Sequence, residues 1–547
     1  MATLALDQAP PAPAPEGTRF DYQSHPLAKF LFVAILLGAL AFAGWSVLDD
    51  TRGVGETLEL GVFAFLGVAL LIALGFEFVN GFHDTANAVA TVIYTNSMPA
   101  HVAVVWSGFF NFLGVMLSSG AVAYAIITLL PVDLILNVGS AAGFAMIFAL
   151  LFAAVIWNLA TWYVGLPNSS SHTLIGSVLG VGLANQLILQ GSRGGTAGVD
   201  WGQVQKVLTG LWMAPLIGFG AALLLVLVMR LLVRRPELYR SPEGNAPPPR
   251  GIRALMIFTC TAVSFTHGSN DGQKGMGLIM LILIGCAPTA YALNRTLPAS
   301  ETPAFVQTAN VATSVFDARG GAVDMPVEQA RGLLTVSLQQ HRIDTPQTYA
   351  ALESLSRDLS ARVAGYGSLK AVPAEATHNV RNDMYLVLDS TRLITKKPPA
   401  DFSKADVSAV KAYQTRLEAG TRFIPLWVKI VVAIALGLGT MIGWKRIVIT
   451  VGEKIGKHQM TYGQGAASGL VTAGTILAAD QFGLPVSTTH ILSSSVAGGS
   501  VGSGGGLQAR TIGNLAAAWL LTLPVAMALS GGLYWLLLAV VKAMGAG

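Results

Sequence analysis

The feature that most constrains this chain is a series of apolar runs close to the length that crosses a bilayer. A helix needs about 20 apolar residues to span the hydrocarbon core. Runs of this kind lie at residues 29–48, 60–79, 102–130, 141–163, 209–233, 252–266, 276–293, 425–444 and 512–541. Because backbone groups in lipid must pair within their own segment, these runs predict an all-α polytopic membrane protein.

The composition agrees with this class. Of the 547 residues, 53% are hydrophobic and only 12% are charged, against about 25% charged in soluble domains. The formal net charge of +5 does not point to nucleic acid, because the basic residues cluster in short loops beside apolar runs. Cys260 and Cys286 lie within apolar runs and are expected to be buried small hydrophobes.

Shorter apolar stretches are interrupted by glycine and polar residues. They lie at 81–98, 167–190, 463–482 and 485–505. Such stretches are tolerated at membrane depth only where protein or a water-filled cavity satisfies the backbone. We expect broken helices or re-entrant hairpins, a long helix over 252–293 that breaks at its polar centre, and roughly ten to twelve membrane segments in all.

The distribution of charge and proline predicts the domain organisation. We expect a disordered tail at 1–25, a first transmembrane half at 26–250 with a basic linker at 230–253, the start of the second half at 251–294, an extramembrane helical insertion at 295–420, and the rest of the second half at 421–547. The tail is rich in proline and alanine and lacks the layout of a signal peptide. Basic loops favour the cytoplasm, so 230–253 and 445–457 are expected inside an inner (plasma) membrane and 295–420 outside.

Two pairs of motifs indicate an internal repeat. NGFHDTANAVAT, from Asn80, is followed by GLPNSSSHTLIGSVLG, and GSNDGQKG, from Gly268, is followed by GLPVSTTHILSSSVAG. The insertion explains why the second pair lies farther apart. Paired interrupted segments in two halves are typical of a secondary transporter with inverted repeats and a site at their interface.

The hydroxyl-rich motifs predict an anion site. Proline ends one helix, the following Ser and Thr residues suit the start of the next, and a helix N-terminus attracts anions. The predicted donors are Ser169, Ser170, Ser171, Thr173, Ser487, Thr488 and Thr489. The alternative is that these residues only cap two half-helices and pack inside the bundle.

The acidic motifs predict the coupling site. A carboxylate at membrane depth costs roughly 2.5–3.5 kcal/mol, so Asp84 and Asp271 need a cation, a proton or a partner. Alignment of the halves sets Asn87 against Lys274 and His83 against Asn270. Asn87, Asn270 and Lys274 are predicted to contact the substrate, and the Lys274 ammonium can replace a bound cation. The alternatives are structural carboxylates and an ion pair between Lys274 and an aspartate.

Four histidines lie in or beside the motifs: His83, His172, His267 and His490. Because histidine titrates near neutrality they are candidates for a proton relay, with satisfied core histidines as the alternative. No metal-ligand spacing such as HExxH occurs, and no resident metal, cofactor or catalytic residue is predicted.

GFHDTANAVATVIYT, GLPNSSSHTLIG, SNDGQKGMG and GLPVSTTHILSSSVAGG together resemble the PiT family of inorganic phosphate transporters, over residues 60 to 540. The insertion is similar to that of the bacterial low-affinity, proton-coupled branch. The resemblance implies inverted repeats around one site, phosphate uptake driven by H⁺ or Na⁺, co-transport of a divalent metal as a metal–phosphate complex, arsenate as a look-alike substrate, and a homodimer. Many sodium-coupled relatives have asparagine where this chain has Lys274, which favours protons.

The sequence therefore predicts import of inorganic phosphate with H⁺ by alternating access of two halves. A sodium-coupled transporter and a transporter of another oxyanion, such as sulfate, are the alternatives. An intramembrane aspartyl protease is disfavoured because neither aspartate lies in a GxGD context. A serine hydrolase and an ATP-driven pump lack their motifs as well, so the chain is predicted not to be an enzyme.

Overall fold

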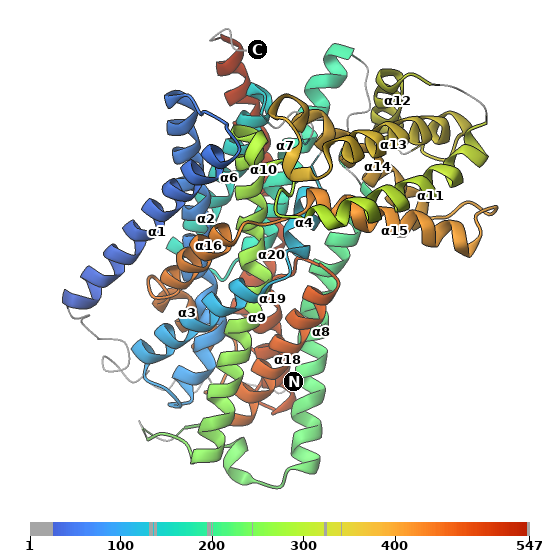
Figure 1. The fold of residues 1–547 in the computed structure, drawn as a ribbon. Helices are drawn as coiled ribbons and strands as arrows, with labels where there is room; N and C mark the ends of the chain where they lie inside the picture. The colour runs from blue at the N-terminus through green and yellow to red at the C-terminus, as the bar shows by residue number, and fades with distance from the viewer. Residues whose placement is uncertain are drawn as a thin grey trace.

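A computed structural model describes residues 26–130, 135, 139–193, 199, 201–242, 244, 246–321, 325–340 and 342–543. Throughout these residues the regular structure is helical and no β-strand occurs (Figure 1). The predicted all-α fold is confirmed. The predicted tail at 1–25 lies outside the described residues.

The helices outside the insertion follow one another along the chain as α1 Pro26–Gly53, α2 Leu60–Tyr94, α3 Ala100–Leu117, α4 Ala121–Ile127, α6 Ala141–Tyr163, α7 Ser170–Arg193, α8 Trp201–Leu232, η1 Pro236–Tyr239, α9 Arg250–Cys286, α10 Pro288–Tyr291, α16 Leu426–Gly439, α17 Lys445–Glu453, α18 Tyr462–Gln481, α19 Thr488–Gly502 and α20 Ala509–Ala543. In the described part of the chain, 6 helices are long and apolar enough to cross a membrane, or 7 if Lys404–Thr421 and Leu426–Gly439 form one bent span. The predicted number of segments is not confirmed, because α7, α9, α18 and α19 carry glycines and polar residues that lower their hydropathy.

Three predicted helix boundaries are wrong. Helix α2 continues unbroken through the acidic motif for 35 residues, and α9 continues for 37 residues through the second acidic motif. Both helices keep their own backbone hydrogen bonds. The polar side chains of the two motifs bind side chains of neighbouring segments rather than unwound backbone. In contrast, the run 102–130 is divided between α3 and α4 at Gly120, which has a φ of 87°.

The two GLP motifs form the turns of two helical hairpins, as predicted. Helices α6 and α7 make the first hairpin, with its tip at 164–169, and α18 and α19 make the second, with its tip at 482–487. Each tip begins at a glycine in the left-handed region, with φ 72° at Gly165 and 60° at Gly483. Side chains other than glycine rarely adopt this conformation, so the paired glycines fix the paired turns.

Helices of each half pack against helices of the other half. Helix α7 of the first half packs on α20, whereas α19 of the second half packs on α8. In the same way α2 packs on α16 and α9 packs on α3, while α2 and α9 meet at the centre. The contacts are close: a Cβ on Gly81 would collide with the Leu436 carbonyl oxygen, and a Cβ on Gly268 with that of Asn111. These matched glycines let α16 pack closely on α2 at the first acidic motif and α3 pack closely on α9 at the second.

The insertion folds around its own apolar core. Its elements are η2 Ala299–Glu301, α11 Thr302–Gly320, α12 Val327–Gln339, α13 Pro346–Tyr366, η3 Leu369–Ala371, α14 Ala374–Lys396 and α15 Lys404–Thr421. It lies toward the end of the bundle opposite the loop between α8 and α9 (Figure 1). Arg381 joins it to the first half by donating to the Ile135 carbonyl oxygen, 3.0 Å away.

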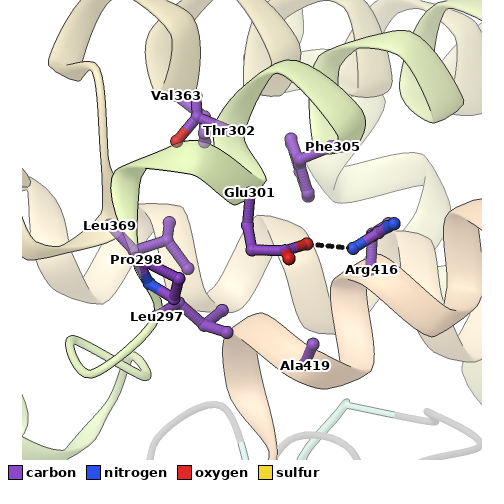
Figure 2. A pocket seen from close by; sticks show the side chains of 9 residues that line it. All are labelled: Leu297, Pro298, Glu301, Thr302, Phe305, Val363, Leu369, Arg416 and Ala419. Atoms are coloured by element: carbon purple, nitrogen blue, oxygen red, sulfur yellow. Dashed lines mark hydrogen bonds and ion pairs between the residues drawn. The ribbon is translucent and has the colours of Figure 1, made fainter.

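A small cavity opens inside the insertion (Figure 2). Its walls are mostly apolar, and they include Leu297, Phe305 and Val363. Its cation, Arg416, is paired with Glu301. Because that charge is already neutralised, the cavity offers no free cation to an oxyanion.

Candidate functional site

Asp84 is held between the two hairpin tips. Its carboxylate accepts a hydrogen bond from Ser170 Oγ at 2.9 Å, a second from Thr489 Oγ1 and a third from Asn87 Nδ2 at 3.3 Å. Asn87 also donates to Thr489 Oγ1 at 2.9 Å. Asp84 is only 2% exposed. One side chain of α2 thus joins the start of α7 to the start of α19.

Asp271 and Lys274 form the matching centre on α9. Lys274 Nζ lies 2.6 Å from Asp271 Oδ2 and also donates to Ser171 Oγ at the first tip. Ser171 in turn donates to the Val486 carbonyl oxygen of the second tip, at 2.6 Å. Lys274 is fully buried. The predicted ion pair of Lys274 with an aspartate is therefore present, and the same ammonium reaches the hydroxyl-rich tip.

His267 brings the two aspartates into one site. Its Nδ1 donates to Asn111 Oδ1 at 2.6 Å, which directs Nε2 toward both carboxylates. Nε2 lies 3.9 Å from Asp84 Oδ2 and 3.6 Å from Asp271 Oδ2. One ligand atom from each of Asp84, His267 and Asp271 lies within 4.8 Å of the others. Two carboxylates and an imidazole suit a proton or a cation, although no sequence spacing indicated a metal motif.

His83 and Asn270 support the site from its two sides. His83 Nδ1 is 3.6 Å from Asp84 Oδ1, and its Nε2 is 3.3 Å from Thr161 Oγ1. Asn270 donates to the Leu484 carbonyl oxygen at 3.1 Å and accepts from the Val486 backbone N–H at 3.4 Å. Asn270 therefore positions the second tip rather than the carboxylates.

Three of the predicted hydroxyls act mainly within their own helices. Ser169 and Ser487 each accept from the backbone N–H three residues later, both at 3.1 Å, so both are N-caps. Thr173 donates to the Ser169 carbonyl oxygen at 2.9 Å. The capping interpretation thus holds for Ser169 and Ser487, and Thr173 bonds within its own helix, whereas Ser170, Ser171 and Thr489 face the charged groups.

The remaining two histidines contact each other. The ring centroids of His172 and His490 are 4.4 Å apart, and His490 stacks on Trp519 at 4.2 Å. His172 Nδ1 lies 2.8 Å from Ser169 Oγ. These matched positions of the two hairpins meet at the repeat interface, one turn beyond the tips.

Several buried polar atoms at this centre have no hydrogen-bond partner among the described residues. They are Asn87 Oδ1, Asp271 Oδ1, His267 Nε2, Thr488 Oγ1 and His490 Nε2. Buried polar atoms are normally satisfied in folded proteins. The cluster therefore has unused capacity for a ligand with both donors and acceptors.

Three further residues of the site were missed by sequence reasoning. Glu77 lies fully buried on α2. An acidic residue inside an apolar run is by itself a sign of a functional residue, so this one could have been predicted. Asn111 holds His267 from α3, and Asp480 receives hydrogen bonds from Ser269 and Gln273, both at 2.8 Å. No spacing could reveal the last two, because their partners are distant in the sequence.

Comparison with known proteins decides the family. The model of the phosphate transporter family matches residues 80–530. The chain belongs to this phosphate transporter family. It is a multi-pass membrane transporter rather than an enzyme, as the sequence predicted.

Its relatives match along nearly their whole length. The low-affinity inorganic phosphate transporter PitA of Escherichia coli K12 is 41% identical over 504 residues, covering 88% of this chain and 98% of PitA. PitB of the same strain is 40% identical, covering 88% and 99%. A solved structure titled the sodium-dependent phosphate transporter aligns with 87% of this chain and 99% of its own, at 19% identity and a TM-score of 0.48. That likeness is too weak to place any element.

Proposed function

We propose that this transporter imports inorganic phosphate together with protons, by alternating access of its two halves around the site between the hairpin tips. The observation that carries the proposal is the convergence at Asp84. Hydroxyls from the starts of α7 and α19, one from each half, donate to the same carboxylate. The same donors and the two helix N-termini suit a tetrahedral oxyanion.

The phosphate would be held by neutral donors and one cation. Ser170, Ser171 and Thr489 supply hydroxyls, Thr488 adds one that has no partner in the described part of the chain, and Lys274 supplies the charge. A phosphate bound there competes with Asp84 for its hydroxyl donors. Asp84 must then lose its charge or gain a cation, because two anions cannot share the donors in a buried site. This competition couples the substrate to a positive charge.

Protons are the proposed coupling ions. Lys274 already places a fixed positive charge beside Asp271, where a second coupling cation would otherwise lie. His267, His83 and the adjacent pair of His172 and His490 are then candidates for moving protons to the aspartates. The cluster of Asp84, His267 and Asp271 could instead receive Na⁺, or a divalent metal carried with phosphate, and these are outcomes of the test below.

Two sets of contacts are proposed as gates. The second tip is fastened to α9 and α4: Gln273 donates to Asp480 at 2.8 Å and accepts from the Val122 backbone N–H at 2.9 Å. The first tip is fastened near α17, where Trp162 donates to the Gly443 carbonyl oxygen at 2.8 Å and Thr450 donates to that of Gly165 at 3.0 Å. Release of one set at a time would open the site to one side.

The direction of transport follows from the positive-inside rule. The basic loops 230–253 and 445–457 are proposed to be cytoplasmic. The insertion lies toward the other end of the bundle (Figure 1), and it is proposed to lie outside. The gate of the second tip, next to α4, would then face the outside.

The test is uptake of radiolabelled phosphate by purified protein in proteoliposomes, with either a pH gradient or a sodium gradient imposed. The proposal predicts accumulation that follows the pH gradient, competition by arsenate and little competition by sulfate. Accumulation that follows sodium alone would overturn the coupling ion. Equal competition by sulfate would overturn the assignment of phosphate, and a requirement for a divalent cation would identify the metal–phosphate complex as the transported species.

A further inference from the structure

Glu77 is a buried carboxyl of the site to which the proposed function gives no role. It lies on α2 two turns before Asp84, and its side chain is fully buried. It faces α9 at Gly275, where a Cβ would collide with the Glu77 carboxyl group. Only glycine leaves room for a carboxyl group against that helix. The packing of α2 on α9 therefore makes a defined place for Glu77 one residue from Lys274.

The contacts of Glu77 do not neutralise a negative charge. Oε2 accepts a long side-chain hydrogen bond from Asn80 Nδ2 at 3.4 Å, and the Gly275 backbone N–H also faces the carboxyl. Oε1 accepts no hydrogen bond from any described side chain. In the part of the chain that the structure describes, Glu77 forms no ion pair, because Lys274 Nζ is bound to Asp271 and Ser171.

The charges of the α2–α9 interface do not balance. Three carboxyls, Glu77, Asp84 and Asp271, share one ammonium, Lys274, within the buried interface. An unpaired carboxylate in this environment is strongly disfavoured. The environment therefore favours a neutral, protonated carboxyl at Glu77 over an unpaired carboxylate.

In the described part of the chain, the surrounding helices bring no other counter-ion to Glu77. The nearby titratable groups on α2 and α9 are His83, Asp84, His267, Asp271 and Lys274. Of the helices packed on α2, α6 carries only Tyr163, its exposed last residue, α3 carries only His101 in its first turn, and α17 lies at the far end against Tyr94. Helices α7, α18 and α19 bring His172, Asp480 and His490 near the hairpin tips. Helix α16 carries Lys429, whose ammonium donates to the Ser118 carbonyl oxygen at 2.8 Å.

The two halves differ at this position. Alignment on the aspartates sets Glu77 against Ser264, whose hydroxyl is bound to Cys260 O at 2.7 Å and to Ser107 Oγ at 2.9 Å. The first half thus has an additional acid, and the second half has an additional base, Lys274. They occupy neighbouring places across the α2–α9 contact.

We propose that Glu77 binds and releases a coupling proton, and that the Lys274 ammonium pairs with its carboxylate once the proton has left. While Lys274 holds Asp271 and the substrate, Glu77 binds a proton from the side that faces the site. After phosphate leaves, the Lys274 ammonium becomes available to the Glu77 carboxylate, and the proton is released on the opposite side. One proton then crosses for each phosphate through Glu77, and no bond other than O–H is formed or broken. This inference rests on the proposed function.

The test compares Glu77→Gln with Glu59→Gln, the same change at an exposed position just before α2. Glutamine keeps the shape of protonated Glu77 but cannot release a proton. In proteoliposomes, Glu77→Gln is expected to exchange internal for external phosphate within about twofold of wild type, and to lose accumulation driven by a pH gradient by roughly tenfold or more. Its ratio of protons to phosphate, measured with a trapped pH dye, should fall by about one. Glu59→Gln should behave like wild type.

The outcomes separate this inference from the proposed function. A wild-type protein that does not accumulate phosphate in a pH gradient would refute the proposed function itself. Wild-type accumulation with an unchanged proton ratio in Glu77→Gln would refute only the role of Glu77. Loss of both exchange and accumulation in folded Glu77→Gln would show a structural role and also refute it.

A second variant covers the case in which Glu77→Gln does not fold. Glu77→Asp keeps an ionisable carboxyl, so it should still accumulate phosphate in a pH gradient, at a lower rate and with the wild-type proton ratio. A lost or lowered ratio in this variant would contradict the proposal.

Discussion

Two regions of this protein bury aspartates in opposite ways. In the insertion, fully buried Asp383 receives Arg331 Nε at 2.7 Å and Arg331 Nη2 at 2.8 Å, and Arg362 binds the same carboxylate. In the membrane bundle, Asp84 is held by hydroxyls and an amide, and its nearest titratable groups are histidines 3.6 and 3.9 Å away. Fixed guanidinium charges give a permanent structural pair. Hydroxyls and imidazoles bind a carboxylate less permanently, so Asp84 can exchange them for a proton, a cation or a substrate-linked partner.

The difference also appears in the atoms that remain unsatisfied. The described contacts of Asp383 involve both of its oxygens. Asp271 has one oxygen paired with Lys274, and its Oδ1 has no hydrogen-bond partner among the described residues. Buried unsatisfied groups cost stability unless a ligand uses them. Substitutions in the membrane site should therefore affect transport first, and substitutions in the insertion should affect folding first.

The largest expected effect is on uptake by Asp84→Asn. Asparagine keeps hydrogen-bonding atoms between Ser170 and Thr489 but cannot carry a charge that responds to the coupling ion. Uptake should fall roughly a hundredfold, while the thermal unfolding midpoint of the purified protein changes little. Normal uptake by folded Asp84→Asn would remove this aspartate from the mechanism.

The same change in the insertion should have the opposite effect. Asp383→Asn leaves Arg331 and Arg362 without their common counter-ion, which should cost about 3 kcal/mol of folding free energy. Thermal unfolding of the full-length protein and its cleavage by thermolysin within 295–420 report the loss. Uptake per folded molecule should stay at the wild-type level. An uptake defect as large as that of Asp84→Asn would contradict the contrast between a structural aspartate in the insertion and a functional one in the membrane bundle.

Lys274→Gln should have the next largest effect. Glutamine can still donate toward Ser171, but Asp271 then lacks its positive partner. We expect phosphate uptake to fall about tenfold, with the apparent affinity for phosphate lowered as well. Measurement of KM and maximal rate at several external pH values checks this; a variant with unchanged values at every pH would place Lys274 outside the site.

The smallest effect is expected at an unpartnered hydroxyl. Thr488→Val removes an oxygen that is buried and has no hydrogen-bond partner among the described residues, so the unfolding midpoint should not fall. If the hydroxyl binds phosphate, KM should rise about threefold, as one neutral hydrogen bond is worth roughly 0.5–1.5 kcal/mol. A lower unfolding midpoint with an unchanged KM would instead give Thr488 a structural role.

Much of the membrane fold could be predicted from the sequence. The paired GLP motifs predicted two hairpins, and Ser169 and Ser487 cap the helices as expected. The continuous course of α2 and α9 was not predicted, because polar residues at membrane depth look like a break when their partners are unknown. The partners come from other helices: Ser170 and Thr489 bind Asp84, and Asn111 binds His267, so the polar groups are satisfied without unwinding α2 or α9.

The candidate site was predictable in its charged residues but not in its connections. Asp84, Asp271 and Lys274 were identifiable as charges within apolar surroundings. The tie of His267 to Asn111 and the fastening of the second tip by Asp480 depend on contacts between residues far apart in the sequence. Ser169, Thr173 and Ser487 were predicted as substrate donors, with capping as the alternative. Ser169 and Ser487 cap their helices and Thr173 bonds back to the Ser169 carbonyl oxygen, because one motif serves capping and binding at neighbouring positions.

The most direct test of the central claim is the location of a bound oxyanion. Arsenate can be located in crystals of this protein by its anomalous scattering. The account predicts one peak between the starts of α7 and α19, within hydrogen-bond distance of Ser170, Thr489 and Lys274. A peak elsewhere, with the two hairpin tips still closed on Asp84, would contradict a shared site between the two halves.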